Sequence, residues 1–222
     1  FVLFITLYLS KKTRYRTVVF FIHLWAKCSC LLLNIKIHRA DKIKVFPGSL
    51  IISNHVGMPD IFVLGSCFPS FFVSKAEISR WPFINLLVKF GATIFVDRRR
   101  KQQVPSTINQ IIERLQSGCS VVIFPESTAT DGSSILPFKS SYFEASIATG
   151  QPAVPIVIKY QDQNSPSVAC WYRINFITHL IRLLKCRRLD VLVEVLPFFK
   201  SESDRRVLAR KCHDSIRQKF LP

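Results

Sequence analysis

The chain has 222 residues and a formal net charge of +17, with 49% hydrophobic and 20% charged residues. This length suits one domain with a sizeable buried core, and the apolar content excludes a disordered chain. A chain this basic favours an anionic partner, either nucleic acid, an anionic membrane surface or acidic small molecules, and the apolar segments among the basic ones favour the membrane.

The first forty residues are apolar and basic and contain no acidic side chain. The chain begins with Phe1 rather than Met, which predicts a fragment or a processed protein. Thr17–Leu33 is strongly apolar, but His23 and Lys27 interrupt it, and it is too short for a transmembrane helix. We expect residues 1–40 to form a membrane-associating segment whose helix lies in the membrane interface. An ordinary core helix with a solvated basic end is the alternative.

Residues 41–222 read as one domain in which short apolar runs alternate with helical patterns. Strands are expected at Leu50–Ser53, Phe71–Ser74, Thr93–Val96, Ser120–Phe124, Ala153–Tyr160 and Val191–Val195. Helices are expected at Ile61–Cys67, Phe83–Phe90, Pro105–Ser117, Ser140–Thr149, Arg173–Lys185 and Ser201–Phe220. This alternation predicts an α/β layered fold with a mostly parallel central sheet flanked by helices. Chemistry in such folds collects in the loops beyond the carboxyl ends of the strands.

The helix expected at Arg173–Lys185 has one apolar side, with charge added by Arg182 and Lys185. The apolar side carries Ile177, Leu180, Ile181 and Leu184. Two interpretations stay open, because such a side can pack on the sheet or form a second membrane-facing surface.

A polar pair, Asn54 and His55, stands where the strand Leu50–Ser53 ends, and Asp60 follows five residues after the histidine. Residues five apart in a continuous helix would point about 140° away from each other. Pro59 breaks that geometry, so the chain can fold back and bring the Asp60 carboxylate near the His55 ring. Such a pair can deprotonate a bound hydroxyl, which is worth about 10²–10⁴ in rate. A structural His–Asp pair is the alternative.

Two further charged groups follow expected strands. Arg98 comes after Thr93–Val96 and opens a basic run, and its planar guanidinium suits a phosphate. A solvated basic turn or a nucleic-acid patch is the alternative for this run. Glu126 comes after Ser120–Phe124, where a carboxylate opposite Arg98 can orient that arginine or the hydroxyl of an acceptor.

Four segments, in this order, resemble the motifs of the glycerolipid acyltransferases, a family that includes the 1-acyl-glycerol-3-phosphate acyltransferases. They are Asn54–Asp60 (N-H-x-x-x-x-D), Gly91–Arg98, Phe124–Thr128 (F-P-E-G-T) and Val154–Ile156 (V-P-[VI]). The resemblance runs from about Leu50 to Tyr160. Ser127 departs from the family, in which glycine is usual, and serine disfavours a positive φ.

The resemblance implies that His55 and Asp60 are catalytic and that no metal, cofactor or covalent enzyme intermediate is needed. It implies substrate-binding roles for Asn54, Arg98, Glu126, Ser127, Thr128 and Lys139. The donor would be acyl-CoA or acyl carrier protein. The acceptor would be a lysophospholipid, 1-acyl-glycerol-3-phosphate, and the product phosphatidic acid.

Other functions are weighed against this one. The acceptor can be another lysolipid, such as lyso-ornithine lipid, or the chain can be a noncatalytic basic module that binds membrane or nucleic acid. The sequence lacks dinucleotide-binding, P-loop, serine-hydrolase and H-E-x-x-H motifs, and its seven cysteines have no C-x-x-C spacing. We therefore expect an O-acyltransferase at the cytoplasmic face of a membrane, with an anionic membrane surface as partner and no nucleic acid.

Overall fold

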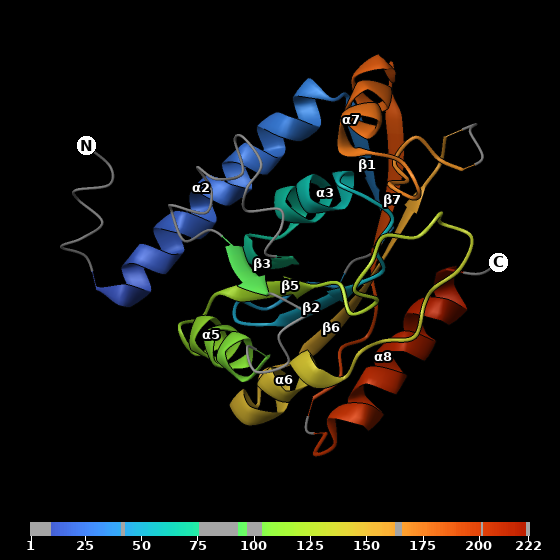
Figure 1. Cartoon of the computed structure of the whole chain (residues 1–222). Coiled ribbons are helices and arrows are strands. Elements are labelled where there is room, and N and C mark those ends of the chain that lie inside the picture. The colour runs from blue at the N-terminus through green and yellow to red at the C-terminus, as the bar shows by residue number, and fades with distance from the viewer. Residues whose placement is uncertain are drawn as a thin grey trace.

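A computed structural model of the protein describes residues 10–40, 43–75, 93–96, 104–162, 166–200 and 202–220. One sheet has the strand order β1-β7-β6-β2-β5-β3-β4 (Figure 1). Its strands are β1 (Ile35–Arg39), β2 (Leu50–Ser53), β3 (Ser70–Lys75), β4 (Thr93–Val96), β5 (Ser120–Ile123), β6 (Ala153–Tyr160) and β7 (Leu189–Val195). Pairing is parallel throughout except between β6 and β7, which confirms the mostly parallel sheet.

Helices cover both faces of the sheet. They are α2 (Lys11–Leu32), α3 (Pro59–Cys67), α5 (Val104–Gln116), α6 (Glu144–Thr149), α7 (Phe176–Lys185) and α8 (Arg205–Phe220), with a 3₁₀ turn η3 (Ser141–Phe143) before α6. Figure 1 shows α2 and α3 on one side of the sheet, α5, α6 and α8 on the other, and α7 beside β1 and β7. The α/β layered fold expected from the sequence is confirmed.

The central strands of the sheet are buried on both faces. Every residue of β2 and β5 is buried, and so are the first six residues of β6. Strands in the middle of a parallel sheet read as continuous apolar runs rather than as alternating patterns. The expected bounds of β2 and β6 are confirmed, whereas β5 ends one residue earlier than expected, and β3 and β7 extend beyond the expected Phe71–Ser74 and Val191–Val195.

β1 was not expected, and some expected helices differ in extent. In β1, apolar Ile35 and Ile37 alternate with charged or polar residues, and only Ile35 is buried. The helix expected at Ser140–Thr149 is divided between η3 and α6. The helix expected at Phe83–Phe90 lies outside the described residues.

The long helix α2 lies along α3 and buries one side against it. Contact between the two helices is close, since a Cβ placed on Gly65 would lie 2.9 Å from the Cβ of Ala26. The opposite side of α2 exposes five large apolar side chains, Phe20, Phe21, Leu24, Leu31 and Leu32. No helix in the described ranges is both long enough and apolar enough to cross a membrane.

Helix α7 turns its apolar stripe outward. Ile177, Ile181 and Leu184 are 61%, 45% and 60% exposed, whereas His179 is fully buried and Leu183 nearly so. The interpretation in which this side packs on the sheet is therefore wrong for these three residues.

Candidate functional site

The predicted catalytic pair lies at the two ends of the loop between β2 and α3. His55 follows the end of β2, and Asp60 is the second residue of α3, after Pro59 has started that helix. The chain folds back between them, so that His55 Nδ1 lies 2.7 Å from Asp60 Oδ2. The contact expected from the proline-broken spacing is confirmed.

Asp60 is fully buried and its carboxylate is saturated with donors. Oδ2 also accepts hydrogen bonds from the backbone N–H groups of Val56 (2.7 Å) and Gly57 (3.0 Å). Oδ1 accepts one from the Tyr160 hydroxyl at 2.7 Å. A buried carboxylate is tolerated only when it is paired in this way. Because the carboxylate accepts, Nδ1 of His55 carries the proton and Nε2 keeps a lone pair.

The backbone and ring of His55 are held from several directions. Its N–H donates to Glu126 Oε1 (2.8 Å), and its carbonyl accepts from the Thr130 N–H (3.0 Å). The imidazole stacks on the ring of Phe124, with centroids 4.2 Å apart and planes 22° apart. The side chain remains 19% exposed, so a substrate can approach it. This arrangement fixes the direction in which a proton is taken up.

Glu126 joins two loops through backbone groups. Oε1 accepts from the His55 N–H and Oε2 from the Leu136 N–H, both at 2.8 Å. Burial raises the pKa of Glu126, and the two backbone hydrogen bonds oppose that rise. Both oxygens thus position the loop that carries His55. The expected partner Arg98 lies outside the described residues.

Ser127 adopts the backbone conformation that glycine favours. Its φ is +68°, and its N–H donates to the Phe124 carbonyl at 3.0 Å to close a tight turn. A side chain in this left-handed region costs about 1–2 kcal/mol. This conformation explains why the similar F-P-E-G-T motif of the family usually has glycine at the position of Ser127.

Of the remaining predicted substrate-binding residues, Asn54 is buried, whereas Thr128 and Lys139 are exposed. The amide of Asn54 is buried and pairs with the backbone of Ile158, donating to its carbonyl and accepting from its N–H, both at 2.9 Å. Asn54 thereby ties the end of β2 to β6. Thr128 and Lys139 are exposed on the loop after β5, where Lys139 donates its backbone N–H to the Pro125 carbonyl.

Two groups that support the loop carrying His55 were not predicted from the sequence. One is the Tyr160 hydroxyl, which binds Asp60. Its position at the carboxyl end of a strand, where functional groups of such folds gather, could have indicated this role. The segment before α7 is the other: the Trp171 N–H donates to the Val56 carbonyl at 3.0 Å. A Cβ on Gly57 would lie 2.0 Å from the Ala169 carbonyl oxygen, so only glycine fits there.

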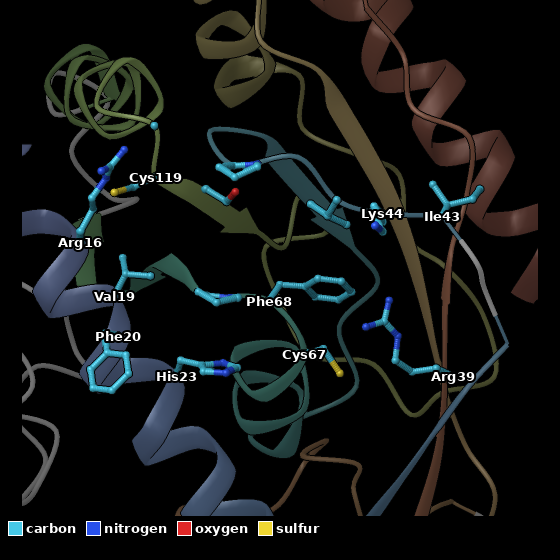
Figure 2. Close-up of a pocket in the computed structure, with 15 residues that line it drawn as sticks. Arg16, Val19, Phe20, His23, Arg39, Ile43, Lys44, Cys67, Phe68 and Cys119 are labelled. Carbon is cyan, nitrogen blue, oxygen red and sulfur yellow. The ribbon is translucent and has the colours of Figure 1, made fainter.

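A cavity of about 540 Å³ lies elsewhere, between α2 and the segments that precede β2, β3 and β5 (Figure 2). Its lining combines apolar side chains such as Phe68 with the basic residues Arg16, Arg39 and Lys44. None of the predicted site residues that the structure describes lines this cavity. Within the described ranges, no group of three or more His, Cys, Asp and Glu side chains is arranged to hold a metal ion.

Known proteins are similar to this chain in sequence and in fold. Residues 34–159 match the family described as Acyltransferase. A 1-acyl-sn-glycerol-3-phosphate acyltransferase of Neisseria gonorrhoeae is 30% identical over 175 residues, which cover 77% of this chain and 68% of that protein. A lyso-ornithine lipid O-acyltransferase of Rhodobacter capsulatus is 33% identical over 177 residues, covering 75% of this chain and 64% of that protein.

The fold is also that of a solved structure. The crystal structure of the 1-acyl-sn-glycerophosphate acyltransferase PlsC from Thermotoga maritima superposes with a TM-score of 0.68 at 18% identity. The match covers 99% of this chain and 85% of that one.

Proposed function

Since this chain belongs to the acyltransferase family, we propose that it transfers a fatty acyl group to the free hydroxyl of 1-acyl-glycerol-3-phosphate. The donor is acyl-CoA or acyl carrier protein, and the product is phosphatidic acid. The observation that carries this proposal is the hydrogen bond between His55 and Asp60, with Asp60 held by three further donors.

The proposed reaction uses only the histidine as acid and base. His55 Nε2 takes the proton of the acceptor hydroxyl while the hydroxyl oxygen attacks the carbonyl carbon of the thioester. The tetrahedral intermediate then collapses as its C–S bond breaks, and the imidazolium returns the proton to the leaving thiolate. Asp60 stabilises the imidazolium between these two steps.

We propose that Arg98 binds the phosphate of the acceptor and that Thr128 and Lys139 add contacts near the site. Exposure of Thr128 and Lys139 beside the Glu126 loop supports this, because their polar groups can reach a bound molecule. Asn54, Glu126 and Ser127 act indirectly, by shaping the loops around His55.

Lyso-ornithine lipid is a second candidate acceptor. Relatives with that name, from Rhizobium meliloti and Rhodobacter capsulatus, are 31% and 33% identical to this chain, close to the value for the glycerophosphate enzymes. The two acceptors differ in the phosphate, so Arg98→Ala separates them. It should raise the KM for 1-acyl-glycerol-3-phosphate and leave that for lyso-ornithine lipid unchanged.

The reaction itself is tested with His55→Ala, assayed with both donors and both acceptors. We expect kcat to fall at least ~10²-fold, as removal of a general base requires. His38→Ala is the matched control, because His38 makes a 2.7 Å contact with Asp190 at an exposed position in β1. Full activity in a folded His55→Ala variant would refute the mechanism, and inactivity of the wild type with every pair would refute the substrate assignment.

We propose that the enzyme works at the cytoplasmic face of a membrane, with α2 in the interface. The exposed apolar side of α2 and the basic residues along that helix support this placement. An anionic surface suits a chain with a net charge of +17.

A further inference from the structure

Helix α7 has the surface of an interfacial helix, facing outward. Ile177, Ile181 and Leu184 are spaced four and three residues apart and therefore form one continuous stripe, each residue 45% exposed or more. The opposite side buries His179 and Leu183. An exposed apolar stripe of this kind marks a surface that binds a membrane or another molecule.

Positive charge runs directly beside this stripe. Arg182 and Lys185 each follow a stripe residue by one position, and both are exposed. Residues 173–188 contain five basic residues and no acidic one. A stripe of apolar side chains flanked by arginine and lysine is the pattern of a helix that lies on an anionic bilayer.

The end of α2 adds apolar surface to the same edge of the molecule. Leu31 and Leu32 are 77% and 81% exposed at the last turn of α2. The ends of α2 and α7 are joined, since the side chain of Asn34 donates to the Arg187 carbonyl and the Leu189 N–H donates to the Asn34 carbonyl. Figure 1 shows both helix ends together at the start of β1 and β7.

We infer that Ile177, Ile181 and Leu184 of α7, with Leu31 and Leu32 of α2, form a docking surface for an anionic lipid bilayer. We call these five residues the α7 surface. The apolar side chains enter the bilayer while Arg182 and Lys185 meet anionic head groups. The α7 stripe is additional to the N-terminal segment, which itself contributes Leu31 and Leu32, and the inference rests on the proposed function only for the identity of the lipid acceptor.

The α7 surface is mechanically connected to the catalytic loop. Trp171 stacks on the buried ring of His179, with centroids 5.8 Å apart and planes 5° apart. The same tryptophan donates its backbone N–H to the Val56 carbonyl in the loop that carries His55. A bilayer held against α7 therefore has a fixed position relative to His55, which suits an enzyme that takes its acceptor from a lipid surface.

The test measures binding of the full chain to vesicles of phosphatidylcholine with phosphatidylglycerol, by cosedimentation. The variant Ile177→Ser/Ile181→Ser/Leu184→Ser should bind at least ~10-fold more weakly. The control Phe198→Ser/Val207→Ser changes exposed apolar residues elsewhere and should bind like the wild type. Arg182→Gln/Lys185→Gln should weaken binding about fivefold per charge, and only to vesicles that contain phosphatidylglycerol.

Acyl transfer to a short-chain lysolipid dissolved below its critical micelle concentration is measured in parallel. The triple variant should keep the wild-type rate there and lose rate on vesicles. Unchanged vesicle binding in the triple variant would overturn the inference, as would an equal loss in the control. Loss of a concentration-dependent dimer, with vesicle binding intact, would instead assign the surface to a second copy of the chain. Absence of acyl transfer in the wild type would refute the proposed function and leave the binding result standing.

Discussion

The hydroxyl of Tyr160, at the end of β6, donates a 2.7 Å hydrogen bond to Oδ1 of Asp60, on the first turn of α3. Burial, together with the neighbouring Asp60 carboxylate, raises the pKa of Tyr160 well above its usual value. The phenol therefore stays protonated and acts as a donor at any pH at which the enzyme works. Tyr160 thus holds Oδ1 of Asp60, whereas His55 binds Oδ2.

Tyr160→Phe should lower kcat about 3- to 30-fold and change both KM values less than about twofold. The ring still fills its site, but Asp60 loses a hydrogen bond of a kind worth about 1.5–3 kcal/mol, only part of which reaches the transition state. Steady-state kinetics with both substrates test this. Tyr172→Phe, at an exposed tyrosine, is the control, and an unchanged kcat in Tyr160→Phe would remove Tyr160 from the positioning of Asp60.

Gly57→Ala should reduce kcat/KM by roughly 10²-fold or more. The new methyl group would lie 2.0 Å from the Ala169 carbonyl oxygen, so the loop that carries His55 must move away from the segment before α7. Gly150→Ala is the control, because its methyl group meets nothing within 4 Å although φ is +63°. That variant should lose about 1 kcal/mol of stability and keep its activity. Equal kinetics in the two variants would contradict the tight contact.

Ser127→Gly should stabilise the protein by about 0.5–1 kcal/mol. Glycine relieves the strain of φ +68°, and the greater freedom of the unfolded chain offsets part of that gain. Ser127→Val should destabilise it by about 2 kcal/mol, since a β-branched residue tolerates this conformation worst. Urea unfolding of both variants measures the effect, and a less stable Ser127→Gly would show that serine contacts outweigh the strain.

The unfolding free energy should fall between pH 6.5 and pH 4 because of His179. Burial lowers the pKa of His179 from 6.5 to about 4, so in that range the unfolded chain binds a proton that the folded chain does not. Stability from this residue is complete above pH 6.5, and the loss reaches about 3 kcal/mol near pH 4. Chemical denaturation across this range should show a flatter profile for His179→Phe. If the unfolding free energies of the wild type and His179→Phe changed in parallel with pH, His179 would not be the cause of the loss.

The sequence was most informative where a local break decides the geometry. Pro59 prevents one continuous helix through His55 and Asp60 and Gly57 loosens the loop between them, so the sequence indicated that the two side chains could meet, as they do. The continuous apolar runs of β2 and β6 identified the centre of the sheet in the same way.

Features that depend on the order of the strands could not be predicted. Tyr160 reaches Asp60 because β6 lies beside β2, although some hundred residues separate them in the chain. The buried amide of Asn54 meets Ile158 for the same reason. Helical periodicity showed that α7 has an apolar side, but the direction in which that side faces depends on where the helix attaches to the sheet.

The loop between β2 and α3 has a consequence for how turnover begins. The N–H groups of Val56 and Gly57 are both bonded to Asp60, and the carbonyls of His55 and Val56 are bonded to Thr130 and Trp171. The proposed base, His55, is therefore preorganised, and its orientation costs little further conformational entropy when a substrate arrives. Binding energy from the lipid can then be used to bring the hydroxyl and the thioester together.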